Sequence, residues 1–190
     1  MFQKRFTHLS AFISFHSFQS LLDREGFSKL LLKGPNKCSL GNFSDVCDGQ
    51  VYQTFVDCDG NLFFQDKRNI GLMLNLDWFQ PYKNSEYSLG VLYCVIINLP
   101  REVRFKWENV IVLAVIPGPT EPKLHINSYL EPHVEDLQSL WNGESFLEKG
   151  DPVFYRVAVF CMSSDIPATR KLGGFKAHNA LSGMFTFFLT

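Results

Sequence analysis

The sequence from residue 71 to residue 79 reads Gly71-Leu72-Met73-Leu74-Asn75-Leu76-Asp77-Trp78-Phe79. This short run is mostly apolar, and turn-forming residues bound it, which favours a buried β-strand over a helix. We predict the strand over 70–76, so that Asp77 lies at its end. Strand ends are where open α/β sheets place reactive side chains, because the strand holds the backbone still.

A second aspartate follows another apolar run of the same kind. Residues 153–162 predict a strand, and the chain then reads Ser163-Ser164-Asp165-Ile166-Pro167. Two carboxylates that converge from neighbouring strands could bind a divalent metal ion for phosphodiester chemistry. Structural alternatives stay open for both residues. Asp77 could be an ordinary turn acid, and Asp165 could cap a helix that has Pro167 in its first turn.

The segments between the two aspartates predict how the strands connect. Residues 89–99 and 109–116 are rich in β-branched residues and stop at prolines, so both are expected to be strands. Between 126 and 142 the period becomes helical, with a predicted apolar face of Ile126, Leu130, Val134, Leu137 and Trp141 and with His133 at the surface.

This order of elements predicts an α/β fold with a mixed sheet. Three sequential strands joined by short turns make an antiparallel meander, and the helix is long enough to return the chain parallel to the first strand. The first and fourth strands would then be neighbours. Asp77 and Asp165 would emerge at the same edge of the sheet.

The N-terminal part of the chain has a different character. Residues 7–33 carry apolar groups at helical spacing and predict one or two helices broken around Gly26. Residues 51–56 and 61–64 are separated by Asp59-Gly60 and predict a short hairpin or an edge extension. We therefore divide the chain into an N-terminal helical segment and loop, 1–43, and a main domain, 44–190.

Composition limits the classes of partner. The 190 residues are 46% apolar, enough for a sizeable core, and the net charge of −1 gives no overall basic field to attract nucleic acid. Basic residues do collect locally. Arg101, Arg104 and Lys106 could contact phosphate or form an ordinary solvated turn, whereas Arg170 and Lys171, just beyond Asp165, are better placed to approach DNA.

The cysteines and the hydropathy pattern indicate no further class of site. The five cysteines show no zinc-ligand spacing, and Cys94 and Cys161 lie in strand-like runs as expected for small buried residues. An odd count fits a reducing compartment. The sequence contains no apolar run of the roughly 18 to 20 residues that a membrane helix requires, so no membrane contact is expected.

The predicted layout resembles the RNase H-like fold, whose first two acids lie on strands one and four. The amino-acid sequences of several segments are similar to those of Tnp2-type transposases of the CACTA (En/Spm) group, over about residues 44–183. The matching stretches are Ser44-Asp45-Val46-Cys47-Asp48-Gly49, Gly71-Leu72-Met73-Leu74-Asn75-Leu76-Asp77-Trp78-Phe79-Gln80-Pro81, Ile116-Pro117-Gly118-Pro119, Tyr129-Leu130-Glu131-Pro132 and Ser164-Asp165-Ile166-Pro167-Ala168.

This resemblance implies a nuclear DDE-type recombinase core that cleaves DNA at transposon ends and joins the new 3′ hydroxyl to target DNA. In that family the corresponding aspartates are the first two metal-binding acids, here Asp77 and Asp165. Their hard oxygen ligands suit Mg²⁺ or Mn²⁺. A third acid, usually a Glu on a later helix, completes the site.

The sequence departs from the family pattern near its end. It stops at Thr190, before the segment expected to carry the third acid, and Met184 and Phe187 stand where relatives have cysteines. We therefore expect an incomplete RNase H-like fold and no zinc site. We expect the chain to be a C-terminally truncated fragment or relic of a transposase. Such a chain would be catalytically inactive and would bind metal weakly or not at all. The alternative is a non-catalytic module that uses the same scaffold to bind protein or nucleic acid.

Overall fold

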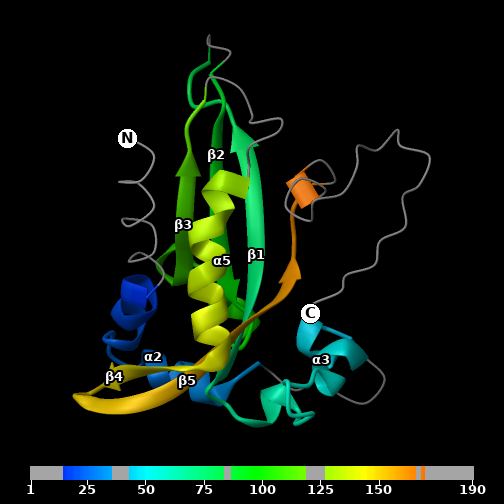
Figure 1. The fold of residues 1–190 in the computed structure, drawn as a ribbon, viewed down its shortest axis with the longest axis vertical. Helices are drawn as coiled ribbons and strands as arrows, with labels where there is room; N and C mark the ends of the chain where they lie inside the picture. Colours follow the sequence, from blue (N-terminus) through cyan, green and yellow to red (C-terminus); the bar gives the residue numbers. More distant parts are fainter. Residues whose placement is uncertain (1–14, 36–42, 84–86, 119–126, 166–167, 170–190) are drawn as a thin grey trace.

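The computed structural model describes residues 15–35, 43–83, 87–118, 127–165 and 168–169. The chain forms an α/β domain with a five-stranded mixed sheet of order β3-β2-β1-β5-β4. Helix α5 (Asn127–Asn142) lies along one face of this sheet (Figure 1). The predicted mixed sheet is thus confirmed, with one strand more than expected.

The first three strands form the predicted antiparallel meander: β1 (Asn69–Phe79), β2 (Leu89–Ile96) and β3 (Val110–Ile116). Strand β1 is longer than predicted. It continues past Asp77, because β2 pairs with it as far as Phe79. Asp77 therefore lies within β1, two residues before its last residue, and not just beyond the end of the strand as predicted.

The crossover also follows the prediction. Helix α5 ends at Gly143, whose φ of 106° suits glycine and whose N–H donates to the Ser139 carbonyl. Strand β5 (Asp151–Met162) then runs parallel to β1. A register shift between Leu72 and Met73 of β1 interrupts this pairing, after which the two strands continue in a new register.

The buried face of α5 differs from the predicted one. Val134 is exposed, whereas His133 is buried, with 3% of its surface exposed, and both Leu137 and Leu140 pack in the core. The spacing of Leu130, His133, Leu137 and Leu140 is three, four and three, which is also a helical face. The prediction of a surface His133 was wrong because its position lies in the middle of this leucine stripe.

Strand β4 (Glu144–Glu148) was not predicted. It forms a hairpin with β5 across Lys149 and Gly150, whose φ values of 56° and 95° are those of a two-residue turn with both central residues left-handed. Phe146 is buried by this pairing and packs edge-on against Phe18. The strand was not predicted because β4 is short and has a glutamate at each end, which leaves only a brief apolar run.

The N-terminal segment forms two helices separated at Gly26, as expected. Residues 15–22 are helical, Gly26 has a φ of 82°, and α2 (Phe27–Lys33) follows. Their apolar side chains Phe18, Leu22 and Leu31 join the core on the side where α5 packs.

The hairpin predicted over 51–64 is reduced to one antiparallel bridge, between Val56 and Leu62. Around the bridge the chain forms short helical segments, with η1 (Val46–Asp48) and α3 (Gln50–Thr54) before it and η2 (Phe63–Gln65) after it. A helix places Tyr52 and Phe55 on one side, where they contact Phe64 and Phe160. Packing of these aromatic rings outweighs the local strand pattern.

The connection from β2 to β3 is short and helical. It consists of α4 (Arg101–Arg104) and η3 (Trp107–Asn109). The start of this connection is buried, from Ile97 to Pro100, so the segment lies against the body of the domain and not in solvent.

Candidate functional site

Asp77 lies on the sheet face away from α5. Alternation along β1 places Leu72, Leu74, Leu76 and Trp78 against the core, so Asp77 points to the opposite side, and its side chain is exposed. Its Oδ1 accepts a hydrogen bond from the Trp78 N–H at 2.9 Å.

Asp165 begins a helical turn beyond β5. Its Oδ1 accepts a hydrogen bond from the Ala168 N–H at 2.7 Å, and its main-chain carbonyl accepts one from the Thr169 N–H at 2.9 Å. This is the geometry of a helix N-cap, so the structural alternative for Asp165 is confirmed. Capping uses one carboxylate oxygen and does not exclude a second role.

The parallel register brings the chain segments of the two aspartates together. Leu74 pairs with Met162, and the Ser163 N–H donates to the Leu74 carbonyl at 2.8 Å. Two residues further along β1, the Leu76 N–H donates to Ser164 Oγ at 2.8 Å. Asp77 follows Leu76 within β1, and Asp165 follows Ser164 in the segment beyond the end of β5.

The donor set at this edge of the sheet suits a hard divalent cation. Both carboxylates are exposed, each binds a neighbouring N–H through Oδ1, and each Oδ2 has no hydrogen-bond partner among the described residues. Oxygen ligands of this kind fit Mg²⁺ or Mn²⁺. Within the same part of the chain, no group of three or more His, Cys, Asp or Glu residues is arranged to bind a metal.

Arg104 is not the phosphate-contacting or solvated residue that its sequence context suggested. Only 3% of its surface is exposed, and its guanidinium forms a bidentate pair with Asp45, with both N–O distances at 2.7 Å. It also donates to the carbonyls of Ile97 and Leu99. The pair fixes η1 against the β2–α4 connection, so its role is structural.

The remaining basic candidates divide into two groups. Arg101 is exposed and donates to the Ser44 carbonyl at 2.7 Å. It therefore contacts the residue next to Asp45, the partner of Arg104. Arg170 and Lys171 lie outside the described residues. A further arginine that the sequence did not single out, Arg156, pairs with Asp57 at 2.9 Å and stacks over Trp141.

Three of the four described cysteines, Cys47, Cys94 and Cys161, are poorly suited to nucleophilic chemistry. Burial raises the pKa of the Cys94 thiol to about 12 and is the main cause that raises the pKa of Cys47 to about 11. It also raises the pKa of Cys161, which is half-buried where the sequence predicted full burial. Thiols with raised pKa values are protonated at neutral pH and are weak nucleophiles.

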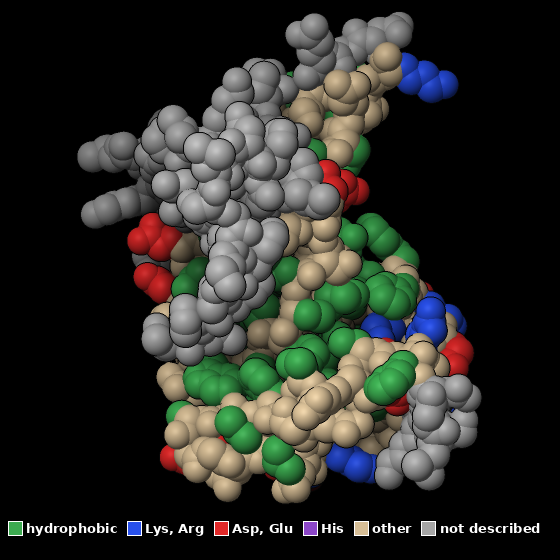
Figure 2. Space-filling view, turned by 90° about the vertical axis from the view of Figure 1, so that its right-hand side faces the viewer, with side chains coloured by type: hydrophobic (Ala, Val, Ile, Leu, Met, Phe, Trp, Pro, Cys, Tyr) green, Lys and Arg blue, Asp and Glu red, His purple; other side chains and the backbone are tan. Residues whose placement is uncertain are grey.

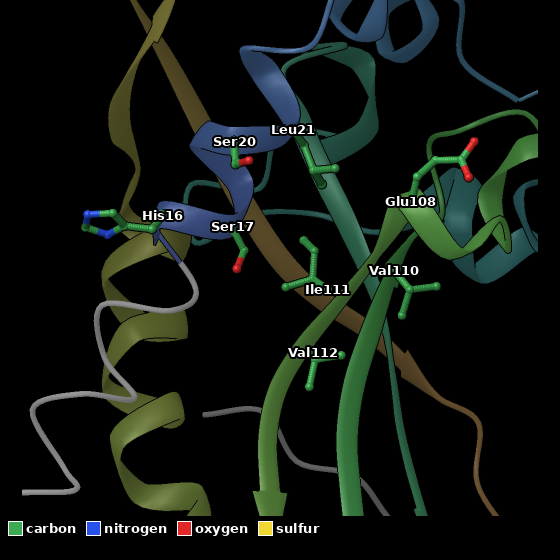
Figure 3. Close-up of a pocket in the computed structure, with 8 residues that line it drawn as sticks. All are labelled: His16, Ser17, Ser20, Leu21, Glu108, Val110, Ile111 and Val112. Atoms are coloured by element: carbon green, nitrogen blue, oxygen red, sulfur yellow. The ribbon is translucent and has the colours of Figure 1, made fainter.

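A surface pocket of about 610 Å³ lies elsewhere, between the helical residues 15–22 and the start of β3. Its polar side chains do not converge. In Figure 3 the His16 ring and the Glu108 carboxylate lie at opposite ends of the view and point away from each other, while Ile111 and Val112 line the strand between them. The pocket therefore offers no catalytic constellation.

Within the described part of the chain, no helix is both long enough and apolar enough to cross a bilayer.

The chain is an α/β protein built on a five-stranded mixed sheet. The sequence profile of "Transposase family tnp2" matches residues 41–187. The chain therefore belongs to the tnp2 transposase family and is transposase-derived. No curated protein shows significant similarity to it.

Proposed function

We propose that this chain is part of the catalytic domain of a DDE-type DNA transposase of the CACTA group, with an RNase H-like arrangement of its sheet. Membership of the tnp2 family supports the proposal, as does the strand order with β1 between an antiparallel and a parallel neighbour. The observation that carries it is the parallel β1–β5 register, extended by the bond from the Leu76 N–H to Ser164 Oγ, which leads to Asp77 on β1 and to Asp165 three residues beyond the end of β5.

In this proposal Asp77 and Asp165 hold one divalent cation through carboxylate oxygens, with water completing its shell. When bound, Mg²⁺ or Mn²⁺ would help activate a water or a 3′ hydroxyl and stabilise the leaving oxygen at a DNA phosphate. The chain's own contribution is positional. Strand β1 fixes Asp77, and the capping bond from Ala168 orients the Asp165 carboxylate.

We further propose that DNA is the partner and that the protein acts in the nucleus. Arg170 and Lys171, close to Asp165 in sequence, are proposed to contact DNA phosphate.

Mn²⁺ binding to the full chain tests the metal site directly. We expect the wild-type protein to bind one Mn²⁺ with a Kd on the order of 10⁻⁴ to 10⁻³ M, a range given by sites with few charged ligands. Asp77→Asn and Asp165→Asn should each weaken binding at least tenfold, because each removes a charged ligand. Mn²⁺ electron paramagnetic resonance measures the free ion and gives Kd.

The matched control is Asp59→Asn, which removes an exposed carboxylate in the turn after α3. It should bind Mn²⁺ as the wild type does. Equal Mn²⁺ affinity of Asp77→Asn, Asp165→Asn and Asp59→Asn would sink the proposed site, and the transposase-like metal chemistry with it.

A further inference from the structure

We propose that Ser164 is a positioning residue whose hydroxyl holds Asp165 beside Asp77. The inference rests on the proposed function, since it assigns Ser164 a part in building that metal site. Its basis is the hydrogen bond from the Leu76 N–H to Ser164 Oγ at 2.8 Å, which is part-buried and joins residues 88 positions apart in sequence.

This bond replaces a regular sheet bond where β5 ends. Strand β5 stops at Met162, and its last main-chain link to β1 is the bond from the Ser163 N–H to the Leu74 carbonyl. In a continuing parallel ladder the Leu76 N–H would donate to a main-chain carbonyl of the neighbouring strand. The Ser164 side chain accepts that bond instead, so it extends the contact between the two chain segments to the residue before each aspartate.

The backbone of Ser164 is also held from its other side. The Thr169 hydroxyl donates to the Ser164 carbonyl at 3.2 Å, and the Thr169 N–H donates to the Asp165 carbonyl. Asp165 thus lies between the sheet and a turn whose Ala168 is buried in the core. The Ser164 hydroxyl ties the residue before Asp165 to β1, so its removal would loosen the position of Asp165 relative to β1.

Such a shift matters for a shared cation. Ligand groups must be held within about 0.5 Å of their working geometry, and loss of a residue that orients a ligand typically weakens metal binding 10- to 100-fold. Ser164→Ala should therefore weaken Mn²⁺ binding by about that factor although it removes no ligand. Ser164→Thr keeps the hydroxyl and should restore the affinity to within about threefold of wild type.

The chain offers a matched control in the preceding residue. Ser163 is exposed and contacts β1 through its main-chain N–H, so Ser163→Ala should leave Mn²⁺ binding unchanged. A second readout needs no metal. The Leu76 amide should exchange its hydrogen with solvent at least tenfold faster in Ser164→Ala than in wild type, and at the wild-type rate in Ser164→Thr and Ser163→Ala.

Two measurements on the full chain separate the proposed metal site from the proposed role of Ser164. They are Mn²⁺ titration and amide hydrogen exchange, each on the wild type and on Ser164→Ala, Ser164→Thr, Ser163→Ala and Asp165→Asn. Wild-type protein that binds no Mn²⁺, or Asp165→Asn that binds as tightly as wild type, overturns the proposed function and the role of Ser164 with it. Aspartate-dependent binding in the wild type that Ser164→Ala retains within twofold overturns the Ser164 role alone.

Circular dichroism of Ser164→Ala checks that the fold persists. If it does not, Ser164→Cys decides, because it keeps the size and weakens the hydrogen bond. Its Leu76 amide should exchange faster and its Mn²⁺ affinity should fall between wild type and Asp165→Asn. Wild-type values for both quantities in Ser164→Cys would overturn the inference.

Discussion

At the scale of single residues, the ion pair of Arg104 and Asp45 explains why two sequence segments far apart in the chain belong together. Asp45 caps η1 by accepting a bond from the Val46 N–H, and its carboxylate also pairs with a guanidinium that is buried. The side chain of Arg104 satisfies two main-chain carbonyls of the buried β2–α4 connection as well. Every group in this cluster has a partner that would be costly to lose.

Arg104→Ala should reduce the free energy of unfolding by about 3–5 kcal/mol, because it leaves the Asp45 carboxylate and two carbonyls without their donor. Urea denaturation followed by circular dichroism measures the change. The control is Arg101→Ala on the exposed side of the same loop, which should cost less than about 1 kcal/mol. An unchanged urea midpoint in Arg104→Ala would show that the arginine is not the buried structural residue described above.

At the scale of secondary-structure elements, helix α5 carries a buried histidine with consequences for pH. Burial lowers the pKa of His133, and its Nδ1 has no hydrogen-bond partner among the described residues. The folded protein therefore binds the proton less readily than the unfolded chain, whose histidine has a pKa of about 6.5. Stability should fall as the pH drops below that value, because protonation favours the unfolded state.

His133→Leu should remove much of this pH dependence between pH 7 and pH 5, while changing stability at pH 7 by no more than about 1–2 kcal/mol, since the leucine fits an apolar environment. Thermal unfolding at a series of pH values measures the slope. Val134→Leu, on the exposed side of the same helix, should keep the wild-type slope. A slope equally steep in both variants would assign the pH dependence to other groups.

The elements also show which parts of the fold can be predicted from sequence. Strands β1, β2, β3 and β5 were recognised because each is a β-branched or apolar run bounded by turn residues, and their order led to the correct pairing of β1 with β5. The segment 51–64 has a similar local pattern, but residues 51–54 are helical and the strand pairing is one bridge, because Tyr52 and Phe55 pack on Phe64 and Phe160. Long-range contacts of that kind leave no signal in a local pattern.

For the candidate site, periodicity predicted the pairing of β1 with β5 on which it depends. The convergence of Asp77 and Asp165 at one sheet edge stays a prediction. The bond between Leu76 and Ser164 was not predicted, because it depends on where β5 leaves the sheet. The burial of Arg104 was missed for a related reason, since its partner Asp45 lies in a different segment of the chain.

At the scale of the whole molecule, the central strand β1 joins two halves of the chain that are distant in sequence. It pairs with β2 on one side and with β5 on the other. Helix α5 lies along one face of the sheet and connects β3 to the β4–β5 hairpin (Figure 1). The face that carries α3 and β5 presents hydrophobic side chains across its middle (Figure 2). Disruption of the β1–β5 pairing is therefore expected to unfold the sheet as a unit and not strand by strand.

The cysteines provide a direct measure of that cooperativity. Cys94 lies at the centre of the sheet on β2, opposite Leu74 and Ile111, and burial raises its thiol pKa from 9.0 to about 12. Cys58 is exposed in the turn that follows α3. Under native conditions an alkylating reagent should modify the exposed Cys58 at least about 1,000-fold faster than Cys94, because Cys94 is buried and its raised pKa alone lowers its own thiolate fraction by about that factor.

Mass spectrometry of peptides after timed alkylation gives both rates. If the sheet opens as a unit, the rate at Cys94 should rise steeply with urea and should give the same free energy as the global unfolding transition, whereas the rate at Cys58 should barely change. Arg104→Ala should then speed modification of Cys94 by the factor that its loss of stability predicts. Modification of Cys94 that is rapid in native buffer, or independent of urea, would mean that β2 opens on its own and that the sheet is not one cooperative unit.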